Sequence, residues 1–390
     1  MKIKKSREDI IMDALVGPCL VVFALLCLYP IWFVLMASFS DSTSVVMSRG
    51  LLLWPKNFSV KAYELVFKNR LFASGFLNSI KLLAMSLPIN LALTVMCGYF
   101  LSCRGMMFKK PIAYMIIFTM FTIVPVVLSF VISFTDFNML QMPNIVWLEN
   151  YINLFFADDI FLIACKNTFI FAAIVGPASY LMSFLVAWFI NELSPRIRAI
   201  VTLIFYAPSI SGQVYMIWGT LFAADSQGWV NAVLMEVGIL VEPKTWFQDA
   251  NWVMPLCIVV ALWTSLGTSF LSFIAGLQGV DRSLYEAGAV DGVKNRWQEL
   301  WFITLPSMKP QLMFGAIMAI TGSFGFGGVV SALAGFPSVD YAAHTIMHHL
   351  EDYGGSRYEI GYSSAIAVVL FAVMVGANMI VKKVISKVGS

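Results

Sequence analysis

Charged residues are scarce in this sequence, and many of them gather between positions 281 and 309. The run from Ala250 to Val280 has none, and the next stretch then carries Asp281, Arg282, Glu286, Asp291, Lys294, Arg296, Glu299 and Lys309. Charged side chains brought together in this way can recognise a complementary surface on another protein. Residues 281–309, here called the charged loop, are therefore the main candidate functional segment.

The first part of the charged loop has the pattern of a short helix followed by a turn. Ser283 and Glu286 form an S-x-x-E capping box, which predicts the start of a helix. Asp291 and Gly292 then supply turn chemistry. A helix presented in this way can bind in a groove of a partner protein. The alternative is that Glu286 only caps its helix and that Gly292 only forms the turn.

The second part of the charged loop resumes a helical pattern in "KNRWQELWFI". Trp297, Leu300 and Trp301 are spaced to lie on one helical face. The helix is expected to end at Leu305–Pro306, because the residue before a proline disfavours the helical conformation. The alternative for the two tryptophans is simple packing at the membrane interface, where tryptophan is favoured.

Asp158, Asp159 and the histidines are the other groups that could do chemistry. His344 and His348 have the i, i+4 spacing that can hold zinc on a helix. No glutamate follows His344 as in H-E-x-x-H, and no fourth ligand is evident, so no metal site is expected. Residues 338–358 are instead expected to form an external element that contacts a partner protein. The sequence also has no G-x-x-x-x-G-K-[ST] loop that could hold ATP phosphates.

The composition explains where these groups must lie. Of the 390 residues, 59% are hydrophobic and 12% are charged, which is about half the charged share of a soluble domain and indicates a membrane protein. A net charge of +3 gives no argument for nucleic-acid binding. The six cysteines lie in or beside apolar runs and are expected to be small buried side chains.

Apolar runs long enough to cross a bilayer predict an all-α polytopic membrane protein with about eight transmembrane helices. The predicted spans are 14–38, 79–102, 112–134, 168–190, 199–222, 252–275, 310–332 and 362–381. The distribution of Lys and Arg places both termini and the charged loop in the cytoplasm. The first span is longer than a secretory signal and is expected to be retained.

The first two spans look like a partial copy of the next two. "YPIWFVLMASFSD" from Tyr29 matches "VPVVLSFVISFTD" from Val124, and "AYELVF" from Ala62 parallels "NYINLF" from Asn150. The pair Asn78–Ser79 likewise parallels the pair at 167–168. The alternative is that any two membrane hairpins share such residues at the ends of their helices.

The residue order in the charged loop points to a known family. "EAGAVDGV" followed by "ITLP" resembles the E-A-A-x-x-x-G…I-x-L-P cytoplasmic loop of the membrane subunits of ATP-binding-cassette (ABC) importers that work with a soluble binding protein. The loop lies between the third-last and second-last predicted spans, as in that family. Two features depart from the family pattern: Gly288 stands in place of alanine, and the interval from Gly292 to Ile303 is one residue longer.

The resemblance implies that the charged loop is a coupling helix that docks on an ATPase subunit. The residues implied are Glu286, Ala287, Gly288, Asp291, Gly292, Trp297, Ile303, Leu305 and Pro306. The implied partners are a second permease, two ATP-binding-cassette ATPase subunits and an extracellular substrate-binding protein. This chain would bind no cofactor and catalyse no reaction, and the ATPase subunits would use ATP and magnesium.

Further stretches resemble the carbohydrate-uptake branch of the same family, the maltose-type permeases. "PVVLSFVISFTDFNMLQMPNIVWLENYINLF" from Pro125 is similar to their first span, and "EIGYSSAIAVVLF" from Glu359 is similar to their last. Residues 112–390 are thus expected to form a six-span permease domain in the plasma membrane of a prokaryote. Residues 1–111 form an extra hairpin that resembles the start of the companion permease, including "WPKNFSVKAYELVF".

Polar and aromatic residues on the middle spans are candidates for a sugar path, because a sugar needs hydrogen bonds and an aromatic face. They are Tyr206, Ser209, Gln213, Tyr215, Trp218, Trp263, Thr264, Ser323 and Phe324. The alternative for each is packing between helices or in the interface belt. The glycine-rich run "GSFGFGG" from Gly322 to Gly328 indicates close helix packing or an irregular backbone beside a cavity.

Two other functions fit part of the sequence. A secondary transporter would explain many spans with an internal repeat, but it would leave the charged loop unexplained and it lacks a central acidic or basic residue. A membrane enzyme would have to build its active site from Asp158, Asp159 and the histidines.

Overall fold

The computed structural model describes residues 7–46, 52–102, 123–210 and 215–385. The regular elements in these ranges are all helices, joined by loops, and the ranges contain no β-strand, only two isolated bridges, Ser40–Phe58 and Thr135–Ile145. The all-α prediction is confirmed for this part of the chain. Helices prevail because a backbone inside a bilayer must satisfy its own hydrogen bonds.

Six stretches in these ranges are long and apolar enough to span a membrane. They comprise α1 (Arg7–Ser38), α4 (Arg70–Ser102), α8 (Asp159–Asn191), α12 with α13 (Ala250–Thr264 and Thr268–Gly279), α17 with α18 (Lys309–Phe324 and Gly327–Ala334) and α20 (Ile360–Ile385). The predicted spans 112–134 and 199–222 run across residues outside the described ranges. Their described parts are α6 (Val124–Ile132), α9 (Pro195–Ile210) and α10 (Met216–Leu221).

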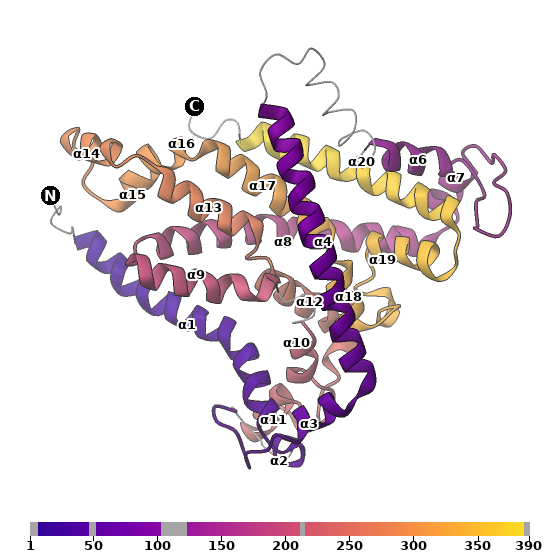
Figure 1. Ribbon diagram of the computed structural model, residues 1–390, viewed down its shortest axis with the longest axis horizontal. Helices are drawn as coiled ribbons and strands as arrows, with labels where there is room; N and C mark the ends of the chain where they lie inside the picture. The colour runs from indigo at the N-terminus through magenta and orange to yellow at the C-terminus, as the bar shows by residue number, and fades with distance from the viewer. Residues whose placement is uncertain (1–6, 47–51, 103–122, 211–214, 386–390) are drawn as a thin grey trace.

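Short helices connect these spans. They are α2 (Ser42–Val46), α3 (Lys61–Lys68), α7 (Glu149–Phe156), α11 (Trp229–Glu236), η2 (Trp246–Gln248), η4 (Val339–Tyr341), α19 (Ile346–Glu351) and η5 (Asp352–Ser356). The charged loop adds α14 (Arg282–Val290), α15 (Arg296–Glu299), η3 (Leu300–Thr304) and α16 (Leu305–Ser307). Figure 1 shows α14, α15 and α16 at one end of α8, and α7 and α19 at its other end.

The long helix α8 is the centre of the bundle and packs against α12, α13 and α17. Phe273 of α13 lies between Tyr180 and Phe184 of α8, with ring centroids 5.5 and 5.6 Å apart. A Cβ atom on Gly315 of α17 would lie 2.3 Å from Phe273 Cζ, so glycine is required for this close approach. The buried aromatic rings thereby fix α8, α13 and α17 to one another.

Two of the predicted spans are broken helices. The span 252–275 divides at Ser265–Gly267, and the span 310–332 divides after Phe324. The second break lies in the glycine-rich run, which confirms an irregular backbone there. Close packing is also present, because a Cβ atom on Gly327 would lie 2.9 Å from Met347 Cγ.

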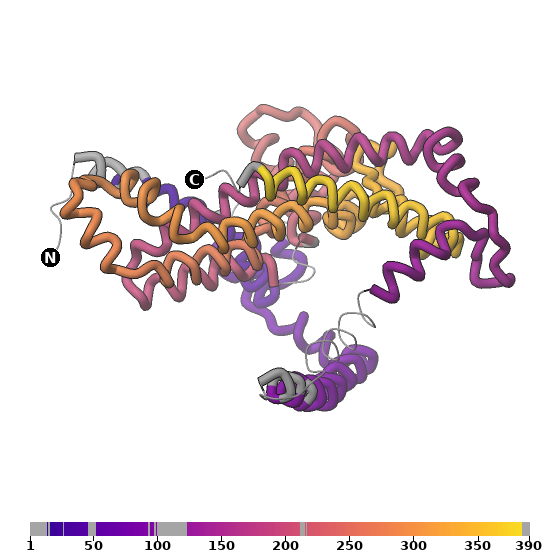
Figure 2. Tube along the Cα trace, turned by 90° about the horizontal axis from the view of Figure 1, so that it is seen from above, coloured from indigo at the N-terminus to yellow at the C-terminus, as the bar shows by residue number. Residues whose placement is uncertain are grey.

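The two helices of the N-terminal hairpin have different surroundings. Helix α1 packs along α9 and α10, where Phe23 stacks on Phe205 with ring centroids 5.5 Å apart. Helix α4 packs on α3, and every side chain of α4 for which exposure is described is exposed. In Figure 1 α4 crosses in front of the other helices, and Figure 2 shows that it lies apart from them.

Candidate functional site

The charged loop is a helix, a turn and a second helix, as predicted, but its caps differ from the prediction. Asp281, not Ser283, is the N-cap of α14, and its carboxylate accepts a hydrogen bond from the Ser283 amide. Asp is as good an N-cap as Ser, and the cap moves the start of the helix to Arg282. Gly292 has φ of +96°, which confirms the turn, because this backbone conformation favours glycine.

The second helix does not end at Leu305–Pro306, so that prediction was wrong. The α-helical turn of α15 passes into the π-helical segment η3 and then into α16, which runs through Pro306 to Ser307. Proline is tolerated here because it lies in the first turn of α16, where a backbone N–H is not needed. The Thr304 hydroxyl donates to the Glu299 carbonyl oxygen at 3.2 Å.

One face of α14 is anchored to the second helix. Gly288 is buried, and a Cβ atom added to it would lie 2.5 Å from Ile303 Cδ1. The Tyr285 hydroxyl forms a 2.9 Å hydrogen bond with the Thr304 hydroxyl. Of the motif residues, Gly288 and Ile303 therefore touch each other. Leu305 is half-buried and Pro306 is exposed at the base of the next span.

The opposite face of α14 is exposed in the part of the chain that the structure describes. Glu286, Ala287, Asp291 and Gly292 are exposed, as the predicted docking role requires. Val290 is 87% exposed at the end of the helix, and sequence reasoning missed it. An apolar side chain presented among charged residues on an anchored helix was the signal that could have identified it.

The second helix is tied to the end of α8. Trp297 is 53% exposed, and its ring centroid is 5.2 Å from that of Trp188. Arg296 forms an ion pair with Glu192, with Nη2 and Oε2 3.4 Å apart. Leu300 is buried, whereas Trp301 is exposed. The three residues predicted to share a face thus divide between the core and the surface.

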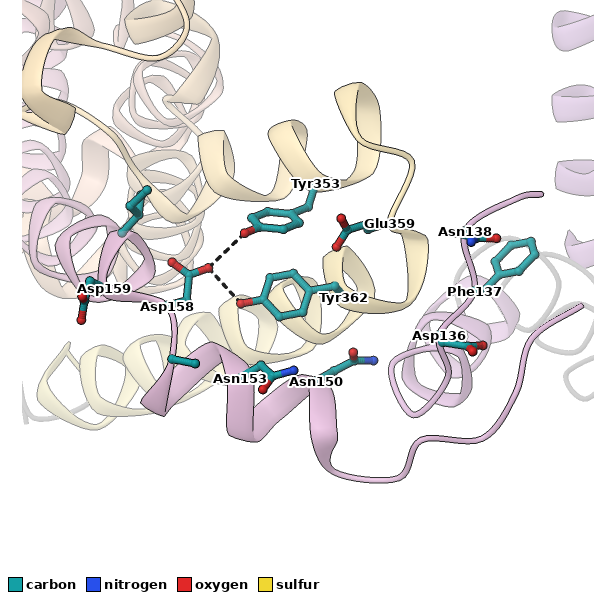
Figure 3. Close-up of a pocket in the computed structure, with 12 residues that line it drawn as sticks. Asp136, Phe137, Asn138, Asn150, Asn153, Asp158, Asp159, Tyr353, Glu359 and Tyr362 are labelled. Atoms are coloured by element: carbon teal, nitrogen blue, oxygen red, sulfur yellow. Dashed lines mark hydrogen bonds between the residues drawn. The ribbon is translucent and has the colours of Figure 1, made fainter. Parts of the chain in front are cut away.

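The histidines and Asp158 come together at the other end of α8. Asp158 caps α8, and its Oδ2 atom lies 2.8 Å from His349 Nε2 and 2.9 Å from the Tyr362 hydroxyl, which donates to it. Figure 3 shows Tyr353 and Tyr362 pointing at this carboxylate, beside a polar cavity of about 760 Å³. We call Asp158, His344, His348, His349, Tyr353 and Tyr362 the histidine cluster.

The pKa values in the histidine cluster are those of buried groups that bond to one another and hold helices together. Burial acts to raise the pKa of Asp158, but hydrogen bonds from His349 and from the Phe161 amide outweigh it and hold the pKa at about 2. Burial lowers the pKa of His344 and that of His348 to about 4. His344 Nε2 lies 3.3 Å from His349 Nδ1, and His348 bonds to Ser331 and Thr345 instead.

The rings of His344 and His348, whose spacing could suit zinc, lie with their centroids 5.5 Å apart, and each histidine bonds to other side chains. In the described ranges no group of three or more His, Cys, Asp or Glu side chains is arranged to hold a metal ion. Asp159, the other carboxylate considered for a catalytic role, is exposed.

The predicted sugar-path residues fall into two places. Tyr206, Trp218 and Trp263 belong to one buried cluster, with the two indole rings 5.5 Å apart. Ser209 and Thr264 lie beside it, and their hydroxyls donate to carbonyl oxygens of their own helices. Helix α1 covers this cluster with Phe23 and Cys27. Tyr215 is half-buried at the start of α10, and Gln213 lies outside the described residues.

Ser323 and Phe324 lie elsewhere, on an apolar groove of about 480 Å³ between α8, α17 and α20. The Ser323 hydroxyl donates to the Ile320 carbonyl oxygen and packs beside Gly176. The groove is lined mainly by small, aliphatic and aromatic side chains, and with few polar groups it offers a sugar few hydrogen bonds. The structure therefore does not bring the nine path residues together, and the path stays a prediction.

Comparison with known proteins places the chain among transport permeases, although no family model matches it. It is 30% identical over 227 residues to the lactose transport system permease protein LacF of Rhizobium radiobacter, with 56% of this chain and 72% of that one covered. It is 29% identical over 276 residues to the probable ABC transporter permease protein YesP of Bacillus subtilis, with 69% and 86% covered.

A solved structure has the same fold. A bacterial ABC transporter that imports the acidic polysaccharide alginate contains a chain that aligns with a TM-score of 0.57 and 25% identity. The alignment covers 72% of this chain and 96% of that chain. A related structure of a bacterial alginate transporter, at 24% identity, holds a periplasmic protein bound to an alginate pentasaccharide.

The chain has six candidate membrane spans in its described ranges and shares its fold with the alginate transporter, which makes it a multi-pass transport permease of the plasma membrane. The relatives identify which kind. The chain belongs to the family of permease subunits of binding-protein-dependent ABC importers, in its carbohydrate-uptake branch. This assignment favours the importer over the secondary transporter and over the membrane enzyme.

Proposed function

We propose that this chain, together with a second permease, forms the path by which a sugar or oligosaccharide enters the cell after delivery by an external binding protein. One of the named relatives is a lactose transport system permease protein, and the alginate transporter imports a polysaccharide, which supports a carbohydrate as substrate. The chain itself binds no cofactor. Partner ATPase subunits hydrolyse ATP with magnesium, and their closing and opening alternates the access of the path. Both termini and the charged loop lie in the cytoplasm.

The observation that carries this proposal is the division of α14 into two faces. Tyr285 and Gly288 hold one face to the second helix of the loop, so α14 cannot simply be a mobile connection. The other face presents Glu286, Ala287 and Val290 to the surroundings. An anchored helix with an exposed apolar and acidic face fits a groove on the ATPase.

The test is to substitute the most exposed apolar residue of that face. Val290→Asp buries no charge within this chain, so the permease should still fold, but a charge in a packed groove should weaken binding of the ATPase at least about tenfold. The matched control is Val241→Asp, because Val241 is 91% exposed and lies in the connection between α11 and η2.

The measurement is the amount of ATPase subunit that co-purifies with the tagged chain in mild detergent, together with sugar uptake by the cells. Loss of both in Val290→Asp, and of neither in Val241→Asp, is the expected result. Equal amounts of ATPase in both variants would show that α14 is not the docking helix. Absence of any ATPase from the unmodified chain would contradict the importer itself.

A further inference from the structure

The N-terminal hairpin and the segment from α6 to α8 share structural details beyond their sequence similarity. In each, the backbone after the first helix forms one isolated bridge, Ser40–Phe58 in the first and Thr135–Ile145 in the second. In each, a serine hydroxyl at the end of that helix bonds to a tyrosine hydroxyl on the short helix that precedes the long one, α3 before α4 and α7 before α8. The distances are 2.9 Å for Ser38–Tyr63 and 2.7 Å for Ser133–Tyr151.

The agreement extends to the long helices α4 and α8. Each has 33 residues, and each carries a proline at the same offset from its first residue, Pro88 in α4 and Pro177 in α8. The short helices α3 and α7 that precede them have eight residues each. Position by position, α4 is therefore a structural counterpart of α8, with a constant shift in numbering.

This correspondence identifies the face of α4 that matches the buried face of α8. Thr168, Val175, Ser179 and Ser183 of α8 are 2%, 0%, 4% and 1% exposed. Their counterparts in α4 are Ser79, Ser86, Asn90 and Thr94, here called the polar stripe. Their spacing of seven, four and four residues places them on one side of the helix. All four are exposed in this chain.

A polar stripe facing hydrocarbon is unfavourable. The hydroxyls of Ser79 and Thr94 donate to carbonyl oxygens of their own helix, at 3.0 and 2.7 Å. The Asn90 amide has no hydrogen-bond partner in the described ranges, and it has both donors and acceptors to satisfy. Such groups inside a membrane are almost always turned toward protein, where they hydrogen-bond across helices.

Helix α8 shows what kind of surface satisfies such a face. The Thr168 hydroxyl accepts a hydrogen bond from the Ile346 amide, at 2.9 Å, and Ser323 of α17 packs against Gly176. The main helices that cover α8 are α13, α17, α12 and α19. Within this chain that surface is already occupied by α8, so α4 cannot use it.

We infer that the polar stripe of α4 is an interaction surface for a second permease subunit, and this inference rests on the proposed function. Two observations favour this occupant over lipid alone. Helix α1 seats the hairpin on α9 and α10 and leaves α4 beside the bundle, facing outward (Figure 2). Residues 1–111 also resemble the start of the companion permease. A helix with this pattern is therefore expected to pack against the rest of a companion permease, which is the second subunit.

The experiment compares substitutions on two sides of α4. Ser86→Trp places a bulky side chain in the polar stripe, and Ala84→Trp places the same side chain on another face of the same helix. The second permease that co-purifies with the tagged full-length chain is quantified by mass spectrometry. Ser86→Trp should lower its amount about tenfold, and Ala84→Trp should leave it unchanged.

Asn90→Leu separates a protein-facing from a lipid-facing stripe. If the stripe faces the second permease, leucine removes the amide contacts and the second permease is lost. If the stripe faces lipid, leucine leaves the complex intact, and the inference is wrong. Equal loss in Ser86→Trp and Ala84→Trp would also overturn the inference, because the effect would not follow the stripe.

Two further readouts keep the outcomes distinct. Cells that carry two differently tagged copies of the chain show whether the stripe instead joins two copies, which would also overturn the inference. The ATPase retained by each variant reports on the proposed function separately. If the ATPase stays bound and no variant changes the amount of second permease, only the inference about α4 is wrong. If the wild-type chain purifies without any partner, the proposed importer function is wrong as well.

Discussion

The two ends of α8 are built in opposite ways. At one end the histidine cluster is closed: His344, His348 and His349 are at most 2% exposed, and Asp158 is surrounded by donors from α19, η5 and α20. At the other end the charged loop is anchored by one face of α14 and leaves the other face open, with Val290 at 87% exposure. Figure 1 shows the two regions at opposite ends of the same helix.

The difference shows that the histidine cluster holds helices of this chain together, whereas the charged loop presents a surface for contact with another protein. A closed network of hydrogen bonds fixes α8 to its neighbours, and breaking it costs stability. An anchored helix with an unpaired face contributes little to the stability of the chain alone, and its substitution should change binding instead.

The largest effect is expected from Asp158→Ala. The substitution removes the N-cap of α8 and leaves His349 and Tyr362 without their acceptor, so unfolding should become easier by about 3 kcal/mol. Thermal unfolding in detergent measures the change. Asp159→Ala is the control, because Asp159 is the next residue and its carboxylate is exposed, so its loss should change the stability little. A similar loss in both variants would mean that the cluster does not hold α8.

The closed end should also make stability depend on pH. Burial holds the pKa of His344 and of His348 at about 4 in the folded protein, below the ordinary value of 6.5. The unfolded chain therefore binds more protons below pH 6.5, and stability is lost as the pH falls from 6.5 toward 4. At pH 5 each histidine should account for up to about 2 kcal/mol.

The measurement is the melting temperature at pH 7 and at pH 5, for the wild type and for His348→Gln. The variant should lose part of the pH dependence, because a glutamine does not titrate. The carboxylate of Asp158 has its pKa at about 2, so its stabilising effect is lost only below about pH 4, outside this window. An unchanged difference between the two pH values would show that His348 is not the titrating group.

These two regions also differ in what the sequence could predict. Membrane spans and the charged loop follow from run length and local spacing, because the bilayer imposes both the helix and its length. The exact caps did not follow, since Asp281 and Ser283 are both good caps and only the fold chooses between them. The π-helical segment η3, which carries the helix through Pro306, has no sequence signal that we recognised.

The histidine cluster could not be predicted from the sequence for a different reason. Asp158 and His349 are 191 positions apart in the chain, and only the packing of α8 against α19 brings them together. Local spacing brought only His344 and His348 into consideration together, whereas His344 also contacts His349, with Nε2 and Nδ1 3.3 Å apart. Contacts between distant segments are fixed by tertiary packing, about which one sequence says little.

A smaller effect is expected inside the charged loop. Gly288→Ala places a methyl group 2.5 Å from Ile303 Cδ1, so Ile303 must shift, at a cost of about 1 kcal/mol. Gly288→Ala combined with Ile303→Val removes that Cδ1 atom and makes room. The double variant should therefore be less destabilised than the sum of the two single variants. Additive losses in thermal unfolding would show that the two side chains do not meet.

The smallest effect is expected from the ion pair that ties the charged loop to α8. The Arg296 guanidinium and the Glu192 carboxylate are 3.4 Å apart, and their side chains are 21% and 41% exposed. Water and salt screen an exposed pair of this kind, so its coupling energy should be below about 1 kcal/mol. A double-mutant cycle with Arg296→Gln and Glu192→Gln, measured at low and at high salt, gives this energy.

The coupling should shrink further in high salt, and it should stay well below the loss caused by Asp158→Ala. That order follows from the construction of α8, whose closed end is held by buried hydrogen bonds and whose open end is held by packing and a screened ion pair. A coupling energy above about 2 kcal/mol that ignores salt would place a buried, structural joint at both ends. The charged loop would then be fixed as firmly as the histidine cluster, and the contrast between the two ends would be lost.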